Sequence, residues 1–370
     1  MNQGNRNRTN RRIIHNFDRI ISLANLFLCW DEFKRDKGRK ADVLAFEFNL
    51  EDNLFQLHDD LINQSYIHGP YSTFRICDPK PRIINKAIVR DRLVQHLVFK
   101  ELYRLFNPTF IYHSYSSRLN KGTHLAVSNL ELALRKVSQN YSVNAFVLKC
   151  DIRKFFASVP HQKLLAIIKR KISEEKLLWL IEEIISSFAI PVDKLPLGGG
   201  RLKDNIIGKR GLPIGNVTSQ ILANIYLNEL DQFIKHQLKI KYYFRYADDF
   251  IIVHNNPDYL KDQLAVINSF LENNLALQLH ADKVSIRKFR QGVDFLGYVI
   301  LPHYKILRTK TKRRMFKKIF KKQELWLSGR LDEEKFQSTR QSYLGLLKHC
   351  QGYELECVIK NSSSRHRPAE

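Results

Sequence analysis

Apolar positions along the chain follow first a helical and then a strand period, and each change marks an expected element. Helical spacing predicts helices over residues 17–30, 49–62 and 88–106. Between the last two, residues 71–77 have the composition of a strand, DPKP marks a turn, and residues 82–84 resume the strand. The N-terminal part of the chain is therefore expected to be helical, with one inserted β-hairpin.

Two short apolar runs in the middle of the chain end on carboxylates or enclose them. Residues 145–150, AFVLKC, predict a buried strand that ends on Asp151. Residues 242–253 alternate and turn at ADD, which predicts a hairpin with Asp248 and Asp249 at its tip. If these strands are neighbours, three carboxylates meet at one point.

Three adjacent carboxylates repel one another, which is tolerable only with bound cations or shifted pKa values. Oxygen ligands without His or Cys indicate Mg²⁺, and two such ions ~4 Å apart are a common device for in-line phosphoryl displacement on nucleic acid. The pattern therefore predicts nucleotidyl transfer or nuclease chemistry. Two unrelated acidic turns remain the alternative, because aspartate is a favoured turn residue.

The segments between these strands are expected to be helical around a glycine-rich loop. Ser158 and Pro160 provide a cap and a first-turn proline for a helix that reaches Ile172, and residues 174–188 and 218–238 predict two more helices. Six of the fifteen glycines lie in the loop: Gly198, Gly199, Gly200, Gly208, Gly211 and Gly215. Such loops usually lie where backbone approaches a ligand or bends sharply.

Composition and charge narrow the class of partner. The 370 residues include 61 Lys and Arg against 37 Asp and Glu, a formal net charge of +24, which favours nucleic acid as the partner. Anionic membrane is the competing partner, but no apolar stretch reaches the ~18–20 residues that span a bilayer. The basic, Asn-rich N-terminus has no signal-type apolar block, so we expect a cytoplasmic protein. Five cysteines without a CxxC pair exclude a zinc ribbon and argue against a disulfide framework.

A basic run near the C-terminus is the strongest local charge feature. From residue 305 to 322, ten of 18 residues are Lys or Arg and none is acidic, with apolar residues at helical spacing between them. This predicts a helix that packs by one side and lies on a nucleic-acid backbone by the other, although such a run can also be a solvated face. The candidate nucleic-acid-binding residues are Lys305, Arg308, Lys310, Lys312, Arg313, Arg314, Lys317, Lys318 and Lys321.

The order of motifs along residues 71 to 348 resembles that of a reverse transcriptase. KPRIINKAIVRDRLVQHLV and SYSSRLNKGTHLA are similar to the fingers blocks, LKCDIRKFF to motif A and GLPIGNVTSQILANIYLNELD to motif B. FRYADDF is similar to motif C, LHADKVSI to motif D and VDFLGYVI to the primer-grip block. Six blocks in the same order are far more specific than the YADD sequence alone.

Within that superfamily the chain most resembles reverse transcriptases of diversity-generating retroelements, found in bacteria and phages. Most relatives, including group II intron and retron enzymes, carry Gln-Gly and later Ser-Pro in motif B, where this chain has Ile214-Gly215 and Ser219-Gln220. SYLGLLKHC at residues 342–350 also resembles the thumb of that group. Two alternatives stay open: a reverse transcriptase of another bacterial role, such as a group II intron or phage-defence enzyme, and a non-catalytic nucleic-acid-binding protein on the same fold.

The resemblance implies an α+β right-hand polymerase fold with an antiparallel-sheet palm, helical fingers and a helical thumb. The implied domains are an N-terminal helical extension (1–65), fingers (66–140), a palm (141–302) with a helical and Gly-rich insertion around 160–210, a thumb (303–358) and a mobile tail (359–370). The implied partners are a template-repeat RNA and its cDNA, dNTPs and a small basic accessory protein that forms a ring.

The resemblance also implies roles for individual residues near the carboxylates. Asp151 and Asp248 would bind two Mg²⁺ ions, for which Mn²⁺ could substitute, and the Ile152 carbonyl would complete a site. Asp249 would be the neighbouring carboxylate of the metal site, which orients the primer end and does not bind metal constantly. Lys283 of motif D would protonate the leaving pyrophosphate, with a solvated surface lysine as the alternative.

Further roles concern the incoming nucleotide. Phe156 falls where the family places the steric gate that rejects a ribose 2′-hydroxyl, whereas Phe155 fits a core aromatic. Three cations on or beside the predicted hairpin can close on a triphosphate: Arg75, Lys80 and Arg82. The motif B and motif C residues expected to contact the substrate are Ile214, Gly215, Gln220 and Tyr246.

Ile214 is the departure with a direct chemical consequence. A glutamine can hydrogen-bond the nucleotide or template, whereas an isoleucine side chain offers only shape. The sequence therefore predicts relaxed selectivity, and in the resembling family this accompanies copying errors at template adenines.

Overall fold

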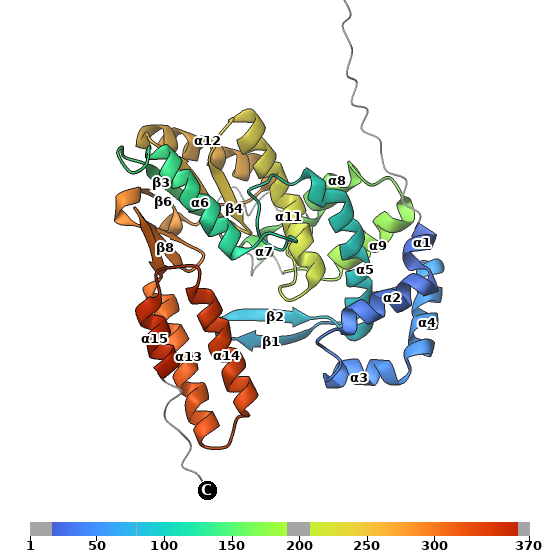
Figure 1. Ribbon diagram of the computed structural model, residues 1–370. Coiled ribbons are helices and arrows are strands. Elements are labelled where there is room, and N and C mark those ends of the chain that lie inside the picture. Colours follow the sequence, from blue (N-terminus) through green and yellow to red (C-terminus); the bar gives the residue numbers. More distant parts are fainter. Residues whose placement is uncertain (1–16, 79, 191–207, 362–370) are drawn as a thin grey trace, which may run out of the picture. The chain divides into compact units, whose positions relative to one another are not determined.

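The computed structural model describes residues 17–78, 80–190 and 208–361 (Figure 1). The chain divides into two compact units, each assembled from three stretches of sequence. The first comprises residues 1–112, 152–239 and 267–280, and the second comprises residues 113–151, 240–266 and 281–370.

The first unit is mainly helical. Its helices are α1 (Phe17–Ile21), α2 (Leu23–Lys34), α3 (Ala41–Phe48), α4 (Leu50–Ile62), α5 (Val89–Phe106), α7 (Phe155–Ser158), α8 (His161–Lys169), α9 (Glu175–Ser186) and α11 (Val217–Gln232). The short helical turns are η1 (Asn107–Thr109), a 3₁₀ turn, and η3 (Phe233–Gln237), a π-helical turn that continues α11. The helix predicted over 17–30 is divided at Ser22, whose hydroxyl accepts a hydrogen bond from the Asn25 N–H and so caps α2.

The predicted hairpin of the first unit is confirmed. Strands β1 (Ser72–Ile76) and β2 (Arg82–Lys86) pair antiparallel, with Ser72 opposite Lys86 and Ile76 opposite Arg82. Strand β1 is largely exposed, whereas β2 is exposed at its start and half-buried from Ile84 onward.

Three details of the predicted helix after Asp151 were wrong. Ser158 does not cap the helix that follows, because it ends α7 and its hydroxyl donates to the Lys154 carbonyl at 3.2 Å. Lys154 has a left-handed φ of 42° and is the N-cap residue of α7, the extra helical turn between β3 and α8. Pro160 is the N-cap residue of α8, and the helix ends at Lys169 instead of Ile172. Of the glycine-rich loop, Gly198, Gly199 and Gly200 lie outside the described residues.

The second unit is built on a four-stranded antiparallel sheet. Its strands are β3 (Phe146–Asp151), β4 (Tyr243–Tyr246), β5 (Asp249–His254) and β6 (Ser285–Lys288), in the order β4-β5-β3-β6. Helix α6 (Thr123–Val137) packs against β4 and β5, as Figure 1 shows. The short turns η4 (Ala281–Lys283) and η5 (Phe289–Gln291) flank β6. Helix α12 (Pro257–Leu275) follows β5, and its residues from 267 onward are assigned to the first unit.

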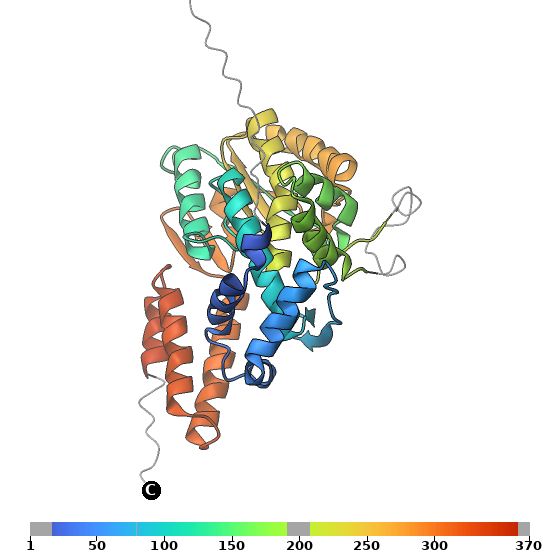
Figure 2. The same ribbon diagram turned by 90° about the vertical axis from the view of Figure 1, so that its right-hand side faces the viewer.

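A second antiparallel sheet and three helices complete this unit. The sheet consists of β7 (Val293–Phe295), β8 (Tyr298–Leu301) and β9 (Tyr304–Leu307), and the helices are α13 (Thr309–Leu327), α14 (Glu333–Leu347) and α15 (Tyr353–Asn361). The three helices lie side by side in both views (Figures 1 and 2). One apolar core joins them to the sheet through Met315, Phe336 and Ile359, among others.

These elements confirm the predicted α+β class with antiparallel sheets. The limits predicted for individual domains remain predictions. Among the described residues, no helix combines the length and apolarity needed to cross a bilayer.

Candidate active site

The predicted neighbourhood of the two carboxylate-bearing strands is confirmed. Strands β3 and β5 pair antiparallel, in a register that sets Asp151 directly opposite Asp249. Asp248 precedes Asp249 in the tight turn that links β4 to β5. The end of β3 and the start of β5, and with them the carboxylates, therefore lie together along the edge of the sheet that the strand ends form.

The electrostatics of this edge reflect burial and charge repulsion. Burial raises the pKa of Asp249 to about 6, the Lys149 ammonium opposes that rise, and the Asp151 and Asp248 carboxylates add to it. A hydrogen bond between the Asp249 and Asp151 side chains acts in the same direction. A bound cation would stabilise the charged forms of these groups and lower the pKa again.

Lys283 lies at the same edge. It ends η4, and its Nζ donates to Asp151 Oδ1 at 2.6 Å. The Asp151 side chain is 14% exposed and that of Lys283 is 42% exposed, so a half-buried carboxylate pairs with a more exposed ammonium group. The structure thus brings together four of the residues singled out from the sequence, although the catalytic role of Lys283 stays a prediction.

The donor set suits a hard cation. Its side-chain donors are carboxylate oxygens, without nitrogen or sulfur, which is the chemistry that Mg²⁺ prefers. Among the described residues, however, no three His, Cys, Asp or Glu side chains are grouped as a metal site. Ile152 begins the next stretch of the first unit, where it is buried and forms an isolated bridge with Leu279. Metal binding by Asp151, Asp248 and the Ile152 carbonyl therefore remains a prediction.

The two phenylalanines of motif A differ in exposure. Phe155 is buried, whereas Phe156 is half-buried, and their rings meet edge to face at 5.3 Å. The Phe156 carbonyl accepts a hydrogen bond from the Leu212 N–H at 2.7 Å, which ties motif A to the segment that opens motif B. Phe155 is thus the core aromatic, and the Phe156 ring keeps an accessible surface.

Backbone hydrogen bonds fix motif B to the hairpin. The Asn85 N–H of β2 donates to the Ile214 carbonyl at 2.9 Å, and the Asn216 side-chain amide donates to the Asn85 carbonyl at 2.8 Å. Gly215 has a φ of +116°, and a Cβ added there would lie 2.6 Å from Cγ2 of Ile84, so only glycine fits. Ile214 is half-buried beside β2, and Gln220 is exposed on α11.

The three predicted triphosphate-binding cations share the hairpin but not one face. Arg75 is opposite Ile83 and Arg82 is opposite Ile76. Because cross-strand partners share a face and successive residues alternate, Arg75 and Arg82 lie on opposite faces. Lys80 is exposed in the connection between the strands. The structure therefore does not bring the three cations together.

The basic run was only partly predicted. Lys305 is not helical, because it lies on β9, where Nζ pairs with Glu131 Oε2 at 2.6 Å. Arg308 is the N-cap residue of α13 and pairs with Asp294. The remaining candidates are exposed on α13: Lys310, Lys312, Arg313, Arg314, Lys317, Lys318 and Lys321. The buried side of that helix carries Met315 and Ile319, as the apolar spacing predicted.

Motif C contains two more residues of interest. Tyr246 pairs with Asp249 across β4 and β5, is half-buried, and its hydroxyl accepts from Thr123 Oγ1 at 3.5 Å. Arg245, which the sequence reasoning missed, is fully buried beside it. The sequence feature that could have drawn attention to Arg245 is its position as a single cation inside the aromatic run YYFRY.

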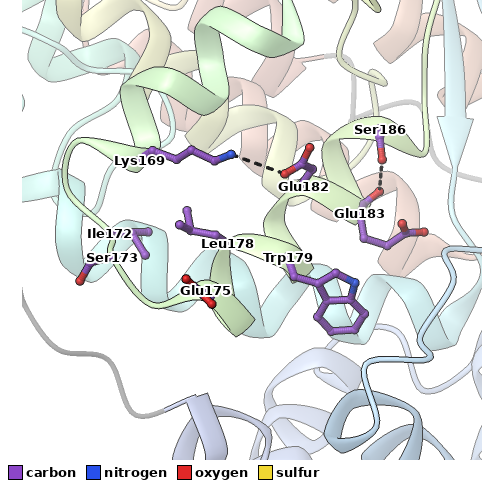
Figure 3. Close-up of a pocket in the computed structure, with 9 residues that line it drawn as sticks. All are labelled: Lys169, Ile172, Ser173, Glu175, Leu178, Trp179, Glu182, Glu183 and Ser186. Carbon is purple, nitrogen blue, oxygen red and sulfur yellow. Dashed lines mark hydrogen bonds and ion pairs between the residues drawn. The ribbon is translucent and has the colours of Figure 1, made fainter.

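A pocket elsewhere in the first unit contains none of the predicted site residues. It lies between α8 and α9, has a volume of about 550 Å³, and is drawn in Figure 3. Lys169 and Glu182 face each other across it at 3.7 Å, and Trp179 lies on its wall. The pocket therefore shares no lining residue with the candidate active site.

Comparison with known proteins identifies the family. Residues 77–300 match the family described as reverse transcriptase (RNA-dependent DNA polymerase), and the chain belongs to this family. This membership supports the predicted right-hand polymerase fold, and it makes residues 77–300 a reverse transcriptase domain, an RNA-directed DNA polymerase.

Individual relatives are distant. The protein YkfC of Escherichia coli (strain K12) is 25% identical over 284 residues, which cover 66% of this chain and 70% of YkfC. The group II intron-encoded protein LtrA of Lactococcus lactis subsp. cremoris is 24% identical over 289 residues, which cover 60% of this chain but only 44% of LtrA. The structure of apo telomerase from Candida tropicalis aligns with a TM-score of 0.47 and 14% identity, over 75% of this chain and 57% of that chain.

Proposed function

We propose that this protein copies RNA into DNA by two-metal nucleotidyl transfer from dNTPs. The observation that carries the proposal is the placement of Asp151 opposite Asp249, with Asp248 in the adjoining turn. These three carboxylates belong to motifs A and C of a chain whose family is defined by RNA-directed DNA polymerisation.

In the proposed reaction Asp151 and Asp248 hold Mg²⁺, or Mn²⁺ in its place. The bound ions would supply charge neutralisation and a lowered pKa for the attacking hydroxyl. Asp249, which lies opposite Asp151 on the neighbouring strand, would orient the primer end, as the resemblance implies. Lys283 already bonds to Asp151 and can deliver a proton to the leaving pyrophosphate from this position.

We further propose that the enzyme serves a diversity-generating retroelement and copies a template-repeat RNA with errors at adenines. Support comes from motif B, where Ile214 replaces the glutamine of most relatives. The Ile214 backbone is held by Asn85, so the side chain is presented from a fixed position and contributes shape alone. A small basic accessory protein that forms a ring is the partner that this role implies.

Sequencing of cDNA tests both levels of the proposal. The purified protein would be given a defined RNA that contains all four bases, an annealed primer, dNTPs and Mg²⁺, with and without the neighbouring gene product. We expect DNA products whose errors concentrate at template adenines, and no products from an Asp151→Asn control. Products with errors spread evenly over the four bases would retain the polymerase and exclude the diversity-generating role.

An intron-type enzyme is the second candidate, because LtrA is a group II intron-encoded protein. An enzyme of that type is expected to show no concentration of errors at template adenines. The same sequencing experiment separates the two, since only the error spectrum differs.

A further inference from the structure

Arg245 is the largest charged side chain buried in the sheet that carries the carboxylates. It lies on β4 between Phe244 and Tyr246 and is 0% exposed. Burial of a guanidinium group is unfavourable unless its N–H groups are hydrogen-bonded. The hydrogen bonds of the Arg245 guanidinium group therefore stabilise its buried position.

The backbone of Arg245 joins β4 to a segment that covers its outer edge. Its N–H donates to the His113 carbonyl at 2.9 Å, and its carbonyl accepts from the Tyr115 N–H at 3.0 Å. Ser114 forms a parallel bridge with Arg245 and is itself fully buried. β4 is consequently held on both sides, by β5 and by residues 113–115.

The guanidinium group contacts the turn between β4 and β5 that contains Asp248. Nη2 donates to Ser114 Oγ at 3.0 Å, and Nη1 donates to the Ala247 carbonyl at 3.1 Å. That carbonyl belongs to the peptide unit whose nitrogen is the backbone nitrogen of Asp248. The hydrogen bond from Nη1 thus fixes the plane of the peptide that immediately precedes the predicted metal ligand.

This turn needs such a support. Ala247 has a φ of +53°, in the left-handed region that residues with a Cβ adopt only at a cost in free energy. Without a fixed carbonyl, the Ala247–Asp248 peptide is free to rotate, which would change the direction of the Asp248 side chain. Ser114 holds the guanidinium at its other end, so the restraint runs from the buried edge segment to the turn.

We propose that Arg245 is a positioning residue that orients the Asp248 carboxylate for Mg²⁺, an inference that rests on the proposed polymerase function. It is fully buried and acts through the Ala247–Asp248 peptide. Ser114 contributes indirectly, because its hydroxyl holds the guanidinium group of Arg245. The opposing interpretation is a core arginine that only fastens residues 113–115 to β4.

The test measures metal binding apart from turnover. Arg245→Lys, Arg245→Met and Ser114→Ala would be compared with the unaltered chain by Mn²⁺ binding in electron paramagnetic resonance, by the Mg²⁺ concentration for half-maximal primer extension, and by thermal unfolding. Loss of a group that orients a metal ligand typically weakens metal affinity or activity by about 10–100-fold. We expect a change of that size in Arg245→Met, a smaller one in Ser114→Ala, and partial recovery in Arg245→Lys.

Arg210 provides the matched control. It is a buried arginine of the first unit whose Nη1 donates to the Ser158 and Ala276 carbonyls, at 3.2 and 3.4 Å. Arg210→Lys should lower thermal stability without a change in Mn²⁺ affinity or Mg²⁺ dependence. The inference is overturned if the folded Arg245 variants bind Mn²⁺ and respond to Mg²⁺ as the unaltered chain does. A chain that binds Mn²⁺ but makes no DNA would instead contradict the proposed function.

Discussion

The edge of the four-stranded sheet and the exposed face of α13 carry opposite charges and are organised in opposite ways. At the sheet edge, strand register and a tight turn set Asp151, Asp248 and Asp249 at one edge, and burial shifts the pKa of one of them. On α13, seven cations project into solvent from a helix that packs by Met315 and Ile319. Nucleotidyl transfer would thus depend on a few fixed carboxylate atoms. Binding to the nucleic-acid backbone would depend on the sum of many replaceable positive charges.

The sharpest way to break this comparison is to remove one carboxylate. Asp248→Ala should lower primer extension on the order of 10³-fold or more, since it removes a group that acts as part of a unit. RNA affinity should stay nearly unchanged, because phosphate contacts supply most of it. Primer extension and filter binding on the same preparation measure both. Asp258→Ala, which removes an exposed carboxylate paired with Lys261, is the matched control. Full-strength extension by Asp248→Ala would show that the active site lies elsewhere.

The second prediction concerns the accessible ring of motif A. Phe156→Ala should raise the ratio of NTP to dNTP incorporation by about 10–100-fold, because it removes the wall proposed to exclude a 2′-hydroxyl. Single-nucleotide incorporation with matched NTP and dNTP measures the ratio. Phe155→Leu, at the buried neighbour, should lower thermal stability and leave the ratio unchanged. An unaltered ratio in folded Phe156→Ala would place the gate at another residue.

The third prediction sharpens the other side of the comparison. Neutralising Lys312, Arg313, Lys317 and Lys321 to Gln should weaken RNA binding and flatten its salt dependence, by up to ~0.7–0.9 units of log Kd per log salt for each lost phosphate contact. Binding isotherms at several salt concentrations give the slope. A control variant removes the same charge from exposed, ion-paired lysines elsewhere: Lys169, Lys176, Lys261 and Lys360. Equal slopes in the two variants would make α13 a solvated face.

The smallest expected effect is on fidelity. Ile214→Gln should reduce errors at template adenines about 2–13-fold, because a restored amide can contribute ~0.5–1.5 kcal/mol to the correct pair. Ile214→Val keeps an apolar side chain and should keep the error rate. Deep sequencing of products from one template compares the variants. Identical adenine errors in Ile214→Gln would show that fidelity is set by other residues.

The sequence by itself determined the elements whose pattern is local. The hairpin of β1 and β2, helix α5 and the strand that ends on Asp151 were all predicted, because apolar period and turn residues act over a few positions. The motif order also determined the family. The sequence identified the three carboxylates, but their proximity depended on β3 and β5 being neighbouring strands.

Only the tertiary structure decided the contacts between distant segments. The register that sets Asp151 against Asp249 arises from strand pairing far apart in sequence, as does the bond from Lys283 to Asp151. The strand at Lys305 overrode a helical pattern because β9 completes a sheet with β8. Arg245 was invisible as a functional residue for the same reason. A charge inside an apolar run acquires its meaning from the partners that bury it, and those partners, Ser114 and the Ala247 carbonyl, are brought to it only by the folded sheet.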